Sequence, residues 1–109
     1  MLLAPEPYFL RAAADTGPLN LHFVRDVGAA YAASGLAALW AAHDPAWRAP
    51  LAAGAALFQL LHAAIHVFEV AAGAQPTSRL LEEAAAIYLP TLILTAIALH
   101  ALRQAPERS

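Results

Sequence analysis

Polar and ionisable side chains recur at a helical spacing along one apolar stretch of the sequence. Gln59, His62, His66, Glu69 and Gly73 follow one another at intervals of 3, 4, 3 and 4 residues, which places them on one stripe of an α-helix. Imidazole and carboxylate groups bind transition metals, and imidazole also titrates near neutral pH. The stripe therefore predicts a polar site on one helix face.

A second polar cluster opens the preceding apolar stretch and contains His22, Arg25 and Asp26. We expect the two stretches to form an antiparallel hairpin with its turn near residue 46 or 47. In that arrangement Asp26 lies beside His66, and Arg25 lies within about one helical turn of Glu69. The two clusters are thus expected to meet at one depth.

The same construction adds hydroxyl groups to this layer. Tyr31 is expected level with His62, and a second turn centred near residue 78 brings a third helix alongside. On that helix Tyr88 would lie near the depth of Glu69, Thr91 near that of His66, and Thr95 near that of His62. We therefore predict a polar network that includes Arg25, Gln59, Tyr31, Tyr88, Thr91 and Thr95.

Several kinds of chemistry fit this cluster. A zinc, iron or copper ion would be held by His62 and His66, completed by Glu69, Asp26 or His22. A purely structural network would neutralise its own charges, with Arg25 on Glu69 and Asp26 on His66. A proton relay or quinone contact is a third hypothesis. Haem is less favoured, because one helix face cannot supply both axial ligands and His22 or a second protomer would be needed.

Composition indicates what kind of fold holds these residues. Of the 109 residues, 61% are hydrophobic and 13% are charged, and the mean hydropathy is +0.55. Soluble domains average about 45–50% apolar and about 25% charged residues. The sequence contains no lysine, which argues against a nucleic-acid partner, and no cysteine, which excludes disulfides and thiolate metal sites.

Three apolar stretches, about 23–42, 50–72 and 84–102, are long enough to cross a bilayer, which takes roughly 20 helical residues. Pro50 suits the first turn of a helix, and Gly73 suits a helix end. Pro90 is expected to kink the third helix. The prediction is an all-α integral membrane protein with about three transmembrane helices in an antiparallel bundle, because a soluble chain this small has no polar shell left to cover them.

The first 22 residues differ from the bundle at 23–109. Prolines and polar residues interrupt them, so we expect a short irregular or interfacial segment. Arginines fall three on each side of the membrane: Arg11, Arg25 and Arg79 on one side, and Arg48, Arg103 and Arg108 on the other. Because Arg25 belongs to the helix and not to a loop, the positive-inside rule favours an external amino terminus.

Two segments resemble a known group of proteins. GPLNLHFVRDVG at residues 17–28 and HAAIHVFE at residues 62–69 look like motifs of small bacterial membrane proteins in the DoxX-like group. The resemblance implies a helical bundle in the bacterial inner (cytoplasmic) membrane. That bundle has four helices, the first of which has no counterpart in this sequence. The resemblance implies no activity.

Together these observations predict a small multi-pass membrane protein organised around an intramembrane cluster of histidine, arginine and carboxylate side chains. The preferred hypothesis is a non-enzymatic component that binds a metal ion at the cluster. The alternative is a structural accessory subunit of a larger membrane complex, such as an electron-transfer, photosynthetic or respiratory assembly. Membrane lipid and either further copies of the chain or a host complex are the expected partners.

Overall fold

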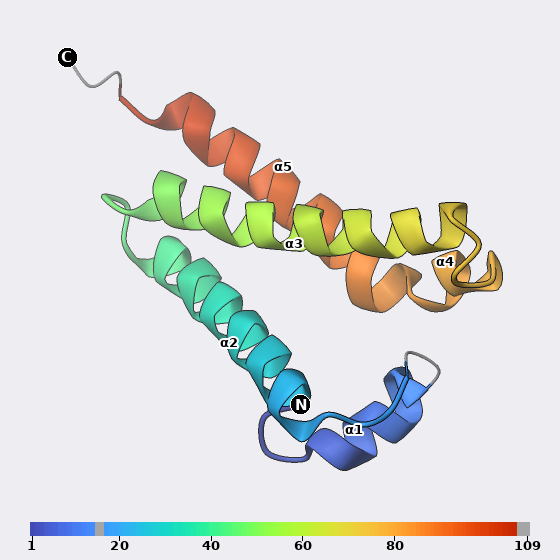
Figure 1. Ribbon diagram of the computed structural model, residues 1–109. Coiled ribbons are helices and arrows are strands. Elements are labelled where there is room, and N and C mark those ends of the chain that lie inside the picture. Colours follow the sequence, from blue (N-terminus) through green and yellow to red (C-terminus); the bar gives the residue numbers. More distant parts are fainter. Residues whose placement is uncertain (15–16, 107–109) are drawn as a thin grey trace. The chain divides into compact units, whose positions relative to one another are not determined.

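The computed structural model describes residues 1–14 and 17–106, and these residues form helices and no strand. In chain order the elements are α1 (Pro5–Ala12), α2 (Leu21–His43), α3 (Arg48–Ala71), α4 (Ser78–Glu82), the π-helical turn η2 (Ala84–Tyr88) and α5 (Leu89–Gln104) (Figure 1). The predicted all-helical class is confirmed. Arg108, which entered the arginine comparison, and residues 15–16 of the amino-terminal segment lie outside the described residues.

The chain divides within α2 into two compact units, Met1–Leu36 and Ala37–Ser109. In the first unit, Asn20 caps α2, because its Oδ1 accepts a hydrogen bond from the backbone N–H of Phe23 at 3.1 Å. The amino-terminal residues pack against α2 at Gly28, where an added Cβ would lie 2.8 Å from Met1 Cβ. The segment expected to be irregular thus contains one short helix, α1.

In the second unit, α3 and α5 lie side by side and run in opposite directions (Figure 1). Four buried alanines form their core, with one alanine from the end of α2, two from α3 and one from α5: Ala41, Ala52, Ala56 and Ala98. Leu51 and Leu94 pack against this cluster. Small side chains let helix backbones approach closely, which is how helices associate where the hydrophobic effect is absent.

Gly73 ends α3 as predicted. Its φ of 75° is a left-handed conformation that glycine adopts without a steric penalty. The N–H of Gly73 donates to the carbonyl of Val70 at 3.1 Å, and the N–H of Ala74 donates to that of Glu69 at 2.8 Å. This is the Schellman arrangement, in which a residue in the left-handed conformation reverses the chain after the helix.

The segment between α3 and α5 is not a simple turn. α4 is a single short helix, and η2 follows it with the N–H of Leu89 bonded to the carbonyl of Ala84, five residues earlier. Pro90 is the second residue of α5 and has no N–H to offer the carbonyl of Ala86. We expected Pro90 to kink a continuous helix; the irregularity observed before it is a π-helical turn.

Two helices of the described chain are long and apolar enough to cross a membrane, Arg48–Ala71 and Ala84–Gln104. They match the predicted stretches 50–72 and 84–102 closely. α2 covers the predicted stretch 23–42 with 23 residues, but it does not reach the same apolarity because His22, Arg25 and Asp26 occupy its first turns. Its role as a third span stays a prediction.

Candidate functional site

The polar stripe on α3 faces the returning segment of the chain. Gln59 is buried, with 7% of its surface exposed, and His62, His66 and Glu69 are half-buried. The carboxylate that the returning segment places opposite this stripe was not among the predicted site residues.

His66 forms an ion pair with Glu83, whose Oε2 lies 2.8 Å from His66 Nδ1. The two side chains are only 24% and 18% exposed. Glu83 directly precedes η2 on the returning segment. The carboxylate oxygen accepts a hydrogen bond from Nδ1 of His66, and Nε2 lies on the opposite edge of the ring.

His62 lies one turn before His66 on the same helix face. The centroids of the two imidazole rings are 4.7 Å apart and the ring planes are tilted by 59°. On its other side His62 stacks on Phe58, with centroids 6.1 Å apart and an interplanar angle of 16°. The aromatic neighbour limits the rotamers of His62 and holds its ring beside the His66–Glu83 pair.

The register between α3 and α5 differs from the prediction by about two helical turns. Thr91 Oγ1 donates to the carbonyl of Gln59 at 3.3 Å, whereas we placed Thr91 level with His66, seven residues further along α3. The prediction centred the turn near residue 78. The chain instead reverses at Gly73 and has already turned back when α4 begins at Ser78.

The predicted hydroxyl network is therefore not centred on the histidines. The single hydroxyl proton of Thr91 serves two main-chain carbonyls, that of Ile87 at 2.7 Å from Oγ1 and that of Gln59 at 3.3 Å. Among the described residues, three buried polar atoms have no hydrogen-bond partner: Gln59 Oε1, Tyr88 OH and Thr95 Oγ1. These three atoms, on α3, η2 and α5, therefore do not form a continuous chain of hydrogen bonds.

The other predicted site residues belong to the first unit. His22 Nε2 lies 3.2 Å from Asp26 Oδ2 one turn along α2, and both side chains are largely exposed. Arg25 is exposed and Tyr31 is half-buried. Since the two units are described separately, the predicted pairs of Asp26 with His66 and of Arg25 with Glu69 stay predictions.

The described residues contain no group of three or more His, Cys, Asp or Glu side chains positioned to hold a metal ion. Four of the five predicted ligands instead occur as two pairs, His22 with Asp26 on α2 and His62 with His66 on α3, and the fifth, Glu69, lies further along α3. Gly73 was a sequence signal for a turn earlier than residue 78, but it did not set the register, since the contacts of His66 with Glu83 and of Gln59 with Thr91 centre the reversal near residue 75.

No protein-family model, no curated protein and no solved structure matches this chain. The resemblance of residues 17–28 and 62–69 to DoxX-like proteins therefore stays a prediction. The function has to be inferred from the helices and from the cluster formed by His62, His66 and Glu83, which we call the His–Glu cluster.

Proposed function

We propose that this chain is an integral membrane protein in which α3 and the helix formed by η2 and α5 cross the bilayer as a hairpin. The support lies in how little of their apolar surface is covered. Only 28% of the most apolar part of α3 and 22% of that of Ala84–Gln104 are buried. Large apolar side chains such as Phe68 and Leu92 are about 70% exposed. In water this surface would be costly at roughly 25 cal/mol per Å², and in lipid it is solvated.

Cysteine labelling tests the hairpin cleanly, because the chain has no cysteine of its own. Ala46→Cys lies in the turn before α3 and Ala74→Cys in the turn after it. A membrane-impermeant maleimide should label them from opposite sides of the membrane. Leu92→Cys, in the apolar middle of the hairpin, should react only after detergent is added. Free labelling at Leu92 in intact membranes would reject insertion.

The same chemistry decides whether α2 is a third span. Ala4→Cys, before α1, should be labelled from the same side as Ala74→Cys if α2 crosses the membrane. It should be labelled from the side of Ala46→Cys if only the hairpin crosses. We propose three spans with an external amino terminus, so residues 4 and 74 should both be labelled from outside the cell.

We infer that the His–Glu cluster primarily holds the hairpin together in a non-enzymatic component of the membrane. The observation that supports this most directly is the 2.8 Å contact between His66 Nδ1 and Glu83 Oε2. His66 lies five residues before the end of α3, about 8 Å along the axis, so the pair closes the end of the hairpin nearest the Gly73 turn. An ionisable pair at such a depth is neutralised internally and needs no ligand.

An accessory role in an assembly follows from the uncovered apolar faces of the hairpin. We propose a homo-oligomer or a larger membrane complex as the functional state, with lipid covering the remainder. Mass measurement of the detergent-solubilised particle tests this directly. A stable particle with the mass of one chain would contradict the proposal.

A second candidate function is binding of a zinc, iron or copper ion by His62 and His66. It is favoured by the orientation of His66: histidine ligands commonly donate their second ring N–H to a carboxylate, as His66 does to Glu83. The neighbouring imidazole, 4.7 Å away between ring centroids, would be the second ligand. Water, or a residue of a partner, would have to complete the coordination.

Elemental analysis of purified protein separates the two candidates. If the cluster binds metal, His62→Ala and His66→Ala should each remove the ion, and His100→Ala, an exposed histidine on α5, should retain it. If the cluster is structural, every variant should lack stoichiometric metal. In that case Glu83→Gln should still weaken the fold.

A further inference from the structure

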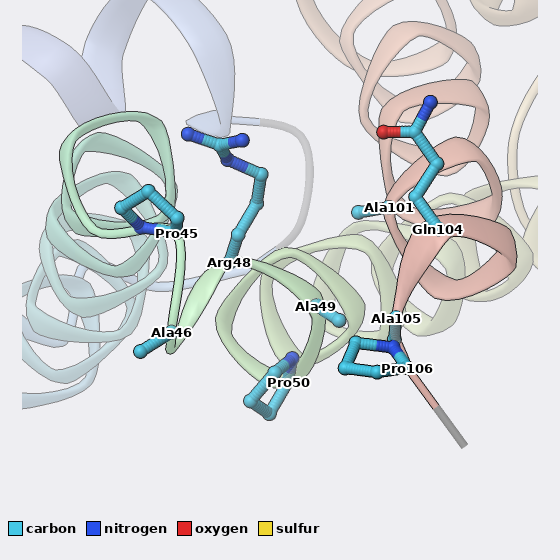
Figure 2. Close-up of a pocket in the computed structure, with 9 residues that line it drawn as sticks. All are labelled: Pro45, Ala46, Arg48, Ala49, Pro50, Ala101, Gln104, Ala105 and Pro106. Carbon is cyan, nitrogen blue, oxygen red and sulfur yellow. The ribbon is translucent and has the colours of Figure 1, made fainter.

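A hollow of about 440 Å³ lies where α3 begins and α5 ends, at the opposite end of the hairpin from the Gly73 turn (Figure 2). Alanine and proline side chains from the turn, the start of α3 and the end of α5 line most of it. Arg48 and Gln104 are the polar residues among the lining, one from each helix. In Figure 2 their side chains extend in the same general direction from the two helix ends.

Arg48 keeps part of its hydrogen-bonding capacity and all of its charge. Nε donates to the carbonyl of Ala41 at 3.1 Å, and Nη2 donates to that of Ala42 at 3.4 Å. These bonds fix the guanidinium and use two of its five N–H groups. No carboxylate is among the described residues that line the hollow.

The nearest acid in sequence, Asp44, is engaged by other groups. Its Oδ1 accepts from the N–H of Ala46 at 3.0 Å, and its Oδ2 accepts from Trp40 Nε1 at 3.3 Å. The first turn of α3 adds a partial positive charge to that of Arg48, because its backbone N–H groups begin a 24-residue helix. Of the described residues that line the hollow, Arg48 therefore carries the only formal charge, and this charge is positive.

Two tryptophans indicate where this end of the hairpin would lie relative to the membrane. The rings of Trp40 and Trp47 are 6.4 Å apart between centroids, and both residues are 55% exposed. Exposed tryptophans and arginines at the ends of apolar helices are typical of the lipid headgroup layer. Arg48 begins one candidate span and Gln104 ends the other, so on insertion the hollow opens at that layer.

We propose that this hollow binds the headgroup of an anionic phospholipid, with Arg48 pairing with the phosphate and the Gln104 amide as a second donor. The inference rests on the proposed membrane insertion. Guanidinium groups suit phosphate because their N–H groups match its oxygens in pairs. The alanine and proline walls leave room for the headgroup and add no competing charge.

Native mass spectrometry of the detergent-solubilised full chain tests the proposal, with phosphatidylglycerol and phosphatidylcholine added in equal amounts. We expect retention of phosphatidylglycerol to exceed that of phosphatidylcholine by about fivefold, the factor that one interfacial arginine contributes. Arg48→Gln should abolish this preference. Arg103→Gln, at the same end but outside the lining, should retain it.

Ala105→Phe tests whether the lipid preference needs the hollow itself as well as the charge of Arg48. Ala105 is exposed and lines the hollow, so a phenyl ring there should fill it without disturbing the core or removing Arg48. We expect this variant to lose the preference, and it also serves if Arg48→Gln does not fold.

Three results would overturn the proposal: no lipid preference in the unmodified chain, a full preference in Ala105→Phe, or an equal loss in Arg103→Gln and Arg48→Gln. Displacement of the lipid by inorganic phosphate at comparable concentration would also overturn it, since the ligand would then be free phosphate. None of these outcomes affects the cysteine-labelling test of insertion, so a failure here and a failure of insertion are distinguishable.

Discussion

Replacing Glu83 with glutamine tests whether the His66–Glu83 pair holds the end of the hairpin. Breaking a fully buried ion pair costs about 3–5 kcal/mol, and exposed pairs contribute about 0–1 kcal/mol. The two side chains are 24% and 18% exposed, so the pair lies nearer the buried limit. Because glutamine retains one hydrogen-bonding oxygen, we expect Glu83→Gln to lower the free energy of unfolding by about 2 kcal/mol.

The neighbouring acid is a matched control. Glu82 has the same charge, but its side chain is 58% exposed and its carboxylate lies 3.9 Å from Arg79 Nη1. Glu82→Gln should therefore cost less than about 0.5 kcal/mol. Unfolding of the detergent-solubilised protein by sodium dodecyl sulfate, followed by circular dichroism, measures both. A double-mutant cycle with His66→Ala should return a coupling of about 1–2 kcal/mol. Equal losses in the two glutamine variants, or a coupling near zero, would refute the reasoning.

Five further substitutions test three other features by the same unfolding assay. Thr91→Val should cost about 1 kcal/mol because it removes the bond to a main-chain carbonyl, and Thr95→Val should be neutral or stabilising because its buried Oγ1 has no partner. Gly28→Ala should cost about 1–3 kcal/mol and expose the amino terminus to protease, because the new Cβ would lie 2.8 Å from a neighbouring side-chain carbon. Gly35→Ala has open space and should be neutral or stabilising. Gly73→Ala should cost about 1–2 kcal/mol, since its φ of 75° penalises any Cβ.

The sequence was sufficient to predict the three long helices, because apolar length and end signals are local. Residues 50–72 and 84–102 correspond to Arg48–Ala71 and Ala84–Gln104, and Gly73 ends α3 through the predicted chemistry. The helix predicted at 23–42 also forms, as α2. Each of these predictions depended only on residues within one element and its immediate flanks.

The partner of His66 could not be predicted correctly, because register accumulates error along the chain. Placing the turn about three residues too late shifted every pairing on the returning helix by about seven residues. As a result, Thr91 was predicted to lie opposite His66, where the structure has Glu83. The spacing of the α3 stripe was read correctly, but a stripe specifies only which side chains share a face and not what lies across from them.

The π-helical turn decides which residues of the returning segment point at α3. Glu83 and Thr91 both contact α3, although eight residues of ideal α-helix would leave them about 80° apart around the axis at about 100° per residue. The turn at Ala84–Tyr88 accommodates one residue more than an α-helical turn, so the two behave as if about seven residues apart, which is within about 20° of two full turns. The extra residue thus brings the side chains of Glu83 and Thr91 onto the same face of the returning segment. Deleting one alanine from Ala84–Ala86 would leave Glu83 and Thr91 seven residues apart in a regular α-helix, so both side chains should still face α3 to within about 20°.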